Sequence, residues 1–278
     1  MRILISADME GTLAAAAAGS VTPGSSAYAS ARSTWTREVN AVAGSLLDVG
    51  AEVVVSDAHD GGSNFEVEEL DPRVSLVHGR GRKFGMMDGI EENIDAVVFL
   101  GYHGAPGSSG VLSHAFLGSG IHELKVNGEA AGEGTMNALL ARHFGAPVIL
   151  VTGDDVAVAE AECYAPDAET VVVKKALSRS SALTRPASYV LAELTQAAER
   201  ALRRFKEGGI TVIAPPASVR LDVEFSSPGS ALAVSAIPGT ERGGTRHISF
   251  CHSDIPVWYR TAGAMWTLAR VSQEQVYG

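Results

Sequence analysis

Five short runs of apolar, β-branched residues recur along the first two thirds of the chain, with helical patterns between them. None of the runs alternates with polar residues, so each predicts a strand that is buried on both faces. The runs are Arg2–Ser6, Glu52–Ser56, Ala96–Leu100, Val148–Val151 and Thr170–Val173. Strands of this kind, separated by helices, pair in parallel and are covered by helices on both sides. The sequence therefore predicts an α/β fold with a mainly parallel central sheet in a three-layer αβα arrangement.

Three long segments predict helices that flank this sheet. In the first segment, apolar residues recur every three or four positions, and a glycine that can end a helix follows. The last segment begins with a proline, whose missing N–H costs nothing in a first helical turn. The predicted helices cover Thr34–Val49, Glu133–Phe144 and Pro186–Phe205.

The last third of the sequence has a different pattern. Val219–Phe225 alternates strictly between apolar and polar residues, which predicts a half-buried strand that is antiparallel or at an edge. A further strand near His247–Cys251 and a closing helix over Ile255–Val271 follow. We therefore expect an α/β domain over residues 1–183, with a smaller α+β portion over residues 184–278 packed on it.

The charge of the chain excludes two classes of partner. Its 278 residues include 22 Lys+Arg and 32 Asp+Glu, for a formal net charge of −10 at pH 7. Nucleic acids and anionic membrane surfaces both attract basic proteins, so we expect neither as a partner. No stretch approaches the ~20 continuous apolar residues of a membrane span. The two cysteines, Cys163 and Cys251, are too few for a disulfide framework, which predicts a reduced, cytoplasmic protein.

Acidic residues or histidine follow most of the predicted strands within a few positions. In chain order these residues are Asp8, Glu10, Asp57, His59, His103, Asp154 and Asp155. The carboxyl ends of parallel strands lie at the same edge of a sheet, where open α/β proteins place their ligand sites. We therefore expect these side chains to converge on one crevice of the predicted domain over residues 1–183.

The residue types indicate a metal site. Carboxylate and imidazole ligands suit zinc, and also manganese or cobalt. The five candidate ligands are Asp8, Glu10, His59, His103 and Glu133. An open catalytic zinc usually takes three protein ligands, so five fit two metal ions that share a carboxylate and activate water for hydrolysis. Asp8 is the natural bridge, and His114, 11 residues after His103, is a candidate for proton transfer.

A set of short motifs occurs in one order along the chain. The motifs are DMEG at 8–11, SDAH at 56–59, GYHG at 101–104, SH at 113–114, NGE at 127–129, GE at 132–133 and GDD at 153–155. In this order and spacing they resemble the zinc-dependent D-aminopeptidases of dipeptide-transport operons, the M55 metallopeptidases. The likeness extends to TREVNA at 36–41, SRS at 178–180 and PGT at 238–240, and so covers nearly the whole chain.

The resemblance implies a cytosolic amino-terminal exopeptidase that hydrolyses short D-amino-acid peptides, typically with D-alanine at the N-terminus. It implies two zinc ions per subunit. By matching motif, their ligands are Asp8, Glu10, His59, His103 and Glu133, with Asp8 as the bridge. His114 of the SH motif would be the catalytic histidine. A homo-oligomer is implied as well, and the best-known relative is a homodecamer.

Several of these residues also have simpler interpretations. Asp154 and Asp155 are well placed to cap the helix that follows them. Asp57 is either a support for His59 or a purely structural residue. Arg179 is a candidate for binding a substrate carboxylate, and a structural salt bridge is an equal alternative. His114 could position the substrate instead of transferring a proton.

The segment Leu13–Ser26, LAAAAAGSVTPGSS, departs from the family pattern because it is poorer in polar groups. We expect it to form a loop or lid close to the metals, so it affects substrate preference more than the type of reaction. Two other functions therefore stay open. One is a related hydrolase that acts on L-, β- or N-substituted amino-acid amides, and the other is a non-catalytic metal-binding assembly protein.

Overall fold

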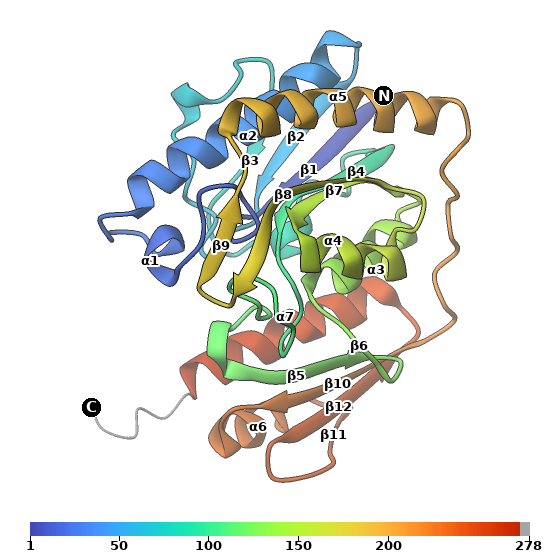
Figure 1. Cartoon of the computed structure of the whole chain (residues 1–278). Coiled ribbons are helices and arrows are strands. Elements are labelled where there is room, and N and C mark those ends of the chain that lie inside the picture. The colour runs from blue at the N-terminus through green and yellow to red at the C-terminus, as the bar shows by residue number, and fades with distance from the viewer. Residues whose placement is uncertain (273–278) are drawn as a thin grey trace.

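The computed structural model describes residues 1–272 and shows two β-sheets in that part of the chain (Figure 1). The larger sheet has seven strands in the order β3-β2-β1-β4-β7-β8-β9. Neighbouring strands are parallel except β8 and β9. The strands are β1 (Arg2–Ala7), β2 (Glu52–Asp57), β3 (Ser75–Val77), β4 (Ala96–Tyr102), β7 (Val148–Asp154), β8 (Glu169–Ser178) and β9 (Ser181–Thr184). The predicted mainly parallel sheet is confirmed.

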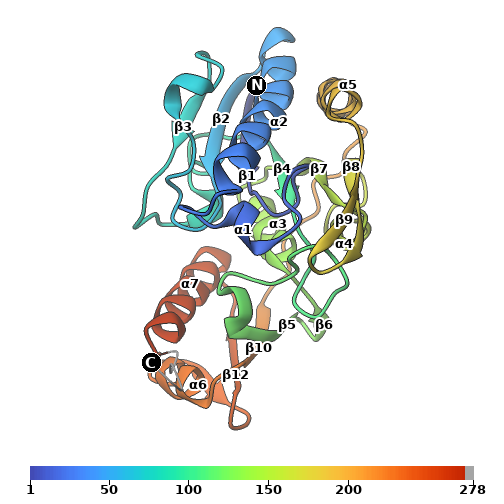
Figure 2. The same ribbon diagram turned by 60° about the vertical axis from the view of Figure 1, so that its left-hand side comes forward.

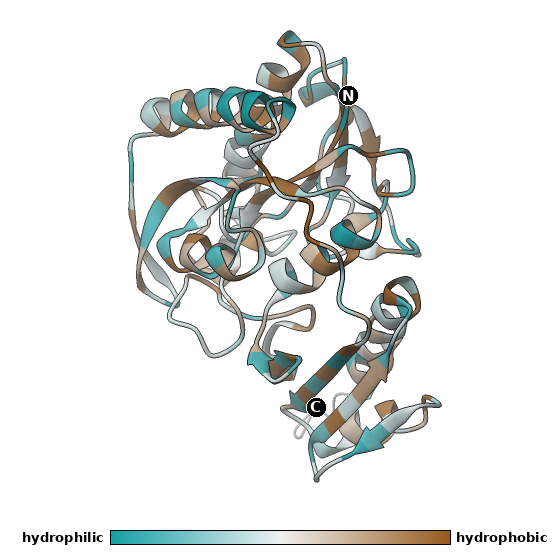
Figure 3. Cartoon of the chain, turned by 90° about the vertical axis from the view of Figure 1, so that its right-hand side faces the viewer, coloured by the Kyte–Doolittle hydropathy of each residue, from teal (hydrophilic) through white to brown (hydrophobic). Residues whose placement is uncertain are grey.

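Helices cover both faces of the larger sheet, which confirms the three-layer αβα arrangement. One face carries α2 (Tyr28–Asp48) and α5 (Ala187–Lys206), and the other carries α3 (Glu133–His143) and α4 (Asp155–Tyr164). The last helix, α7 (Ile255–Val271), packs on α3 and on the smaller sheet. Successive side chains of β1 point to opposite faces of the sheet. Ile3 and Ile5 pack on the α2 side, and Leu4 packs on the α3 side. In Figure 3 the strands at the centre are therefore largely coloured as hydrophobic, whereas the helices also carry hydrophilic residues.

The smaller sheet has five antiparallel strands in the order β11-β12-β10-β5-β6. They are β5 (Ile121–Val126), β6 (Glu129–Ala130), β10 (Val219–Phe225), β11 (Thr240–Arg242) and β12 (His247–His252). The alternating pattern of β10 places Val219, Leu221, Val223 and Phe225 in the core, as predicted for a half-buried strand. Figure 2 shows this sheet with α7 and the short helix α6 (Pro228–Val234) below the larger sheet.

The predicted boundary at residue 184 does not separate the elements of the two sheets. β5 and β6 precede this residue and belong to the smaller sheet, whereas α5 follows it and covers the larger sheet. The segment 103–132 leaves the carboxyl end of β4, supplies β5 and β6, and returns to the larger sheet at α3. The domains over residues 1–183 and 184–278 stay a prediction, and their elements pack with each other across that boundary.

Two glycines bring the carboxyl ends of β1 and β4 together. A Cβ on Gly101 would lie 2.2 Å from the carbonyl oxygen of Asp8, and one on Gly11 would lie 1.9 Å from the carbonyl oxygen of Tyr102. Gly101 also has a φ of +71°, which glycine adopts without steric cost. Only glycine allows this approach, so the strand ends that carry Asp8 and His103 lie side by side.

Within residues 1–272, no helix is both long enough and apolar enough to cross a membrane. Cys163 and Cys251 are both free and exposed. The cytoplasmic location that the cysteine content predicts stays a prediction.

Candidate metal centre

The structure places all five predicted ligands and His114 in the lining of one pocket of about 980 Å³. Asp8 and Glu10 follow β1, His59 follows β2, His103 follows β4 and Glu133 opens α3. These five side chains are buried, and none is more than 7% exposed. The carboxyl ends of three parallel strands and the start of one helix therefore converge, as the topological argument predicts.

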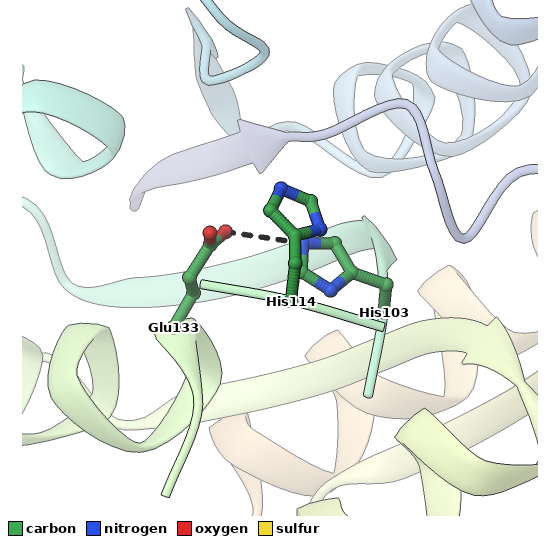
Figure 4. Close-up of side chains that lie close together, drawn as sticks. All are labelled: His103, His114 and Glu133. Atoms are coloured by element: carbon green, nitrogen blue, oxygen red, sulfur yellow. Dashed lines mark ion pairs between the residues drawn. The ribbon is translucent and has the colours of Figure 1, made fainter. Parts of the chain in front are cut away.

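Asp8 lies between two histidine–glutamate pairs. Its Oδ1 is 3.4 Å from Nδ1 of His59, and its Oδ2 is 3.5 Å from Nε2 of His103. Glu10 Oε2 is 3.1 Å from the same nitrogen of His59, and Glu133 Oε2 is 3.4 Å from that of His103. Figure 4 shows the second pair, with Glu133 directed at His103. The site thus has two halves, the Glu10–His59 pair and the His103–Glu133 pair, and Asp8 turns one oxygen to each.

Backbone carbonyl groups orient all three histidine rings. Val21 O accepts from Nε2 of His59 at 2.7 Å, and Gly104 O accepts from Nδ1 of His103 at 3.0 Å. The carbonyl of Leu112 accepts from Nδ1 of His114 at 2.8 Å. A carbonyl oxygen only accepts, so each of these nitrogens carries the proton. The other nitrogens of His59 and His103 face the carboxylates, and these are the nitrogens that would bind a metal ion, as in metal-ligating histidines whose second nitrogen donates to a carbonyl.

Two buried atoms between the halves lack a partner. Asp8 Oδ2 and His103 Nε2 have no hydrogen bond within the described part of the chain. A buried polar atom without a partner costs about 1–3 kcal/mol, and a cation between the two would satisfy both. Carboxylate oxygen and imidazole nitrogen are zinc ligands. The residues therefore fit a metal ion.

The electrostatics of the cluster also favour cations. Burial, together with the charge of Glu10, raises the pKa of Asp8 to about 7. Although burial opposes it, the charge of Glu10 raises the pKa of His59 to about 12. In the same way, Glu133 overcomes burial and raises the pKa of His103 to about 10. Three buried carboxylates that repel one another are stabilised by any cation that binds among them.

His114 lies next to this cluster but is tied to it less closely. Its ring stacks on that of His103, with centroids 4.1 Å apart and 10° between the planes (Figure 4). It offers a nitrogen within 4.8 Å of the ligand atoms of His103 and Glu133. Burial, followed by the charge of His103, lowers its pKa. His114 is therefore in reach of a group that reacts at the His103–Glu133 pair.

The other residues singled out in the sequence have structural roles. Asp154 caps α4, as predicted, and its second oxygen accepts from Val111 N at 2.6 Å on the loop that carries His114. Asp57 accepts from the backbone and side-chain nitrogens of Asn64 at 2.6 and 2.8 Å, and so holds the loop after β2. Arg179 is exposed, and its Nε donates to the carbonyl oxygen of Ser113 at 3.4 Å, on the loop that carries His114.

The segment Leu13–Ser26 lies against the site, as the sequence predicts. It is largely irregular and contains one short helix, α1 (Ala18–Val21). Its residues Val21, Thr22 and Pro23 line the pocket, and the carbonyl of Val21 is the group that orients His59.

Sequence reasoning missed a buried lysine behind the site. Lys174 in β8 is fully buried, and its Nζ donates to the carbonyl oxygens of Glu10, Thr12 and Ala15. The first two distances are 2.5 and 2.7 Å. Glu38 of α2, within the TREVNA motif, accepts from Leu13 N at 2.8 Å in the same turn. The one feature of the sequence that could have indicated a buried lysine is its position directly after the apolar run Thr170–Val173.

Replacing Lys174 with methionine should lower the free energy of unfolding by about 3 kcal/mol, because three buried carbonyl groups lose their donor. It should also weaken zinc binding at the Glu10–His59 pair, since the turn that carries Glu10 loses its support. Urea unfolding and zinc titration measure the two effects. Lys175→Met is the matched control, because Lys175 is exposed in the same strand. Equal unfolding midpoints for the two variants would contradict this role.

A parallel α/β sheet with a buried carboxylate–imidazole cluster at its carboxyl edge is the arrangement of a metal-dependent enzyme. Comparison with known proteins identifies the class more closely. The model of the M55 peptidase family, described as D-aminopeptidase, matches residues 1–264. A D-aminopeptidase of Bacillus subtilis (strain 168) is 31% identical over 271 residues, which are 97% of this chain and 98% of that protein.

A solved structure agrees with this. The Zn-dependent D-aminopeptidase DppA from Bacillus subtilis, described as a self-compartmentalizing protease, matches with a TM-score of 0.92 and 31% identity. The match covers 97% of this chain and 98% of that one. The chain therefore belongs to the M55 D-aminopeptidase family of metallopeptidases.

Proposed function

We propose that the protein is an aminopeptidase that removes the N-terminal residue of short D-amino-acid peptides, typically D-alanine, with two zinc ions. The observation that carries the proposal is the placement of Asp8, whose two oxygens face histidines in separate halves of one buried site. A related protein at 31% identity is described as Zn-dependent, which supports zinc as the metal.

The five proposed ligands form two metal positions. Glu10 and His59 would hold one ion, His103 and Glu133 would hold the other, and Asp8 would bridge them. When bound, the two ions supply Lewis-acid activation of water and of the scissile carbonyl.

His114 would transfer the proton. Because Leu112 O fixes its Nδ1–H, Nε2 is the nitrogen that is free to take a proton from the attacking water and then to give it to the leaving amine. Its stacking on His103 holds the ring beside the His103–Glu133 pair.

A stereochemical panel tests the proposal. The zinc-loaded protein should hydrolyse D-Ala-D-Ala with a kcat/KM at least about 100-fold above that for L-Ala-L-Ala, since the pocket discriminates by the contacts each isomer can make. The corresponding amides and β-alanyl peptides complete the panel. A preference for L-, β- or N-substituted substrates would establish the related amide hydrolase instead. Absence of turnover with both metals bound would establish a non-catalytic protein.

We also propose that the protein assembles as a homo-oligomer, with the homodecamer as the expected form. The solved relative is described as self-compartmentalizing, which requires several copies. Leu177 and Leu183 in the β8–β9 hairpin are 62% and 61% exposed, and such exposed apolar side chains favour a contact between copies. Sedimentation of the purified protein as a monomer would contradict the assembly.

A further inference from the structure

We propose that the mouth of the pocket binds the free carboxylate of a short peptide substrate through the guanidinium groups of Arg80 and Arg270. The inference rests on the proposed peptidase function and narrows its substrates to peptides with an unblocked C-terminus.

The first observation is that Asp60, the residue after the predicted ligand His59, lies between two arginines. Its Oδ2 is 3.9 Å from Nη2 of Arg80, and its Oδ1 is 3.9 Å from Nη1 of Arg270. Arg80 belongs to the loop after β3, and Arg270 belongs to the last turn of α7. One carboxylate therefore gathers two guanidinium groups from separate elements and leaves an excess positive charge.

The second observation places Arg270 at the metal site. Its Nη2 donates to the carbonyl oxygen of Phe116 at 3.1 Å, and the backbone N–H of Phe116 donates to Glu133 at 2.6 Å. Arg270 therefore contacts a neighbour of each half of the site, since Asp60 adjoins His59 and Phe116 binds Glu133. Arg80, Arg270, Asp60 and Phe116 all line the pocket.

The third observation is that glycines in the loop after His59 leave space for arginine side chains. A Cβ on Gly61 would lie 2.7 Å from Nη2 of Arg80, so the guanidinium group rests against bare backbone. Gly62 makes the same room for Arg82. Arg82 is engaged by Ser56 Oγ and Asp57 O at 3.2 and 2.7 Å. Arg80 and Arg270 keep side chains that are 76% and 54% exposed, and so remain available to a ligand.

These contacts give the pocket a basic mouth above the proposed ligand cluster. Among the described lining residues, the mouth carries Arg80, Arg82, Lys83, Arg260 and Arg270, against Asp60 as the carboxylate outside the ligand cluster. A short peptide with an unblocked C-terminus carries a free carboxylate, which suits this mouth. Guanidinium groups bind carboxylates through two parallel hydrogen bonds, which makes them the fitting partner.

The test compares D-Ala-D-Ala with its C-terminal amide. The zinc-loaded wild-type protein should have a KM for the acid about tenfold below that for the amide, which corresponds to one charge-assisted contact of about 1.4 kcal/mol. In Arg270→Gln and Arg80→Gln this acid preference should fall, and in the double variant the two KM values should become equal. Lys83→Gln is the matched control, because Lys83 lines the same mouth but is paired with Glu91 at 2.6 Å. It should keep the acid preference.

Equal KM values for acid and amide in the wild type, or an acid preference that survives both arginine substitutions, would overturn the inference. The L-Ala-L-Ala acid and amide are run in parallel, so a wrong stereochemistry would count against the proposed function alone. If no peptide is turned over, calorimetric binding of the acid and the amide gives the same comparison without catalysis.

Discussion

Replacing His114 with alanine is expected to lower kcat for D-alanyl dipeptides by about 10²–10⁴-fold, the usual contribution of a positioned proton donor. Zinc content should not change, because the five proposed ligands remain in place. The reason lies in the geometry, since Leu112 O occupies Nδ1 of His114 and leaves Nε2 to serve the reaction. Steady-state kinetics and metal analysis of the purified variant measure both quantities.

His122→Ala is the control for this variant, because His122 is exposed on β5. It should keep the wild-type kcat. Two outcomes would contradict the assignment of His114. An unchanged kcat would remove it from the chemistry, and loss of one zinc ion would make it a ligand, which its closeness to His103 and Glu133 makes a real alternative.

Asp8→Asn should have the largest effect of any single substitution. Asp8 is the residue that faces both halves of the site, so the variant should lose zinc from both and bind fewer than one ion per chain. Because activation by the metals is worth several kcal/mol, kcat should fall by about 10³-fold or more. Metal analysis after dialysis, together with kinetics at saturating zinc, measures the two losses.

Glu10→Gln is the matched comparison for Asp8→Asn. The shortest contact of Glu10 with a histidine ligand is the one with His59, at 3.1 Å, so its variant should lose the zinc ion of that pair and keep the other. If Asp8→Asn also lost a single ion, Asp8 would be an ordinary ligand and not a bridge.

Much of the larger sheet and of the site follows from local sequence. Strands buried on both faces are continuous apolar runs, and the residues after β1, β2 and β4 converge because parallel strands end at one edge. An acidic residue or histidine at such an end is therefore placed by topology alone. The roles proposed for those residues rest on the ordered set of motifs, because the whole set is more specific than any single motif.

The smaller sheet depends on pairing between strands that are far apart in the chain, which local sequence does not predict. β5 reads IHELKV, and its polar centre gives no strand signal, yet it pairs with β10 nearly a hundred residues later. An amphipathic helix such as α5 shows that one face is buried but not which sheet it covers. The predicted boundary at residue 184 therefore separated elements that pack together.

Lys174 shows the same limit within the site. Its burial depends on three carbonyl groups of a turn some 160 residues earlier in the chain. A lysine at the end of an apolar run normally extends to solvent, so composition and periodicity predict the opposite of what the fold requires.

The contact between Val21 and His59 has a consequence for how this protein can diverge from its relatives. The group that orients His59 is a main-chain carbonyl, and a main-chain carbonyl is present whatever the side chain. The pocket-lining residues Val21, Thr22 and Pro23 can therefore exchange their side chains while the histidine keeps its orientation. Selection for a new substrate can act on these residues without disturbing the chemistry beside them.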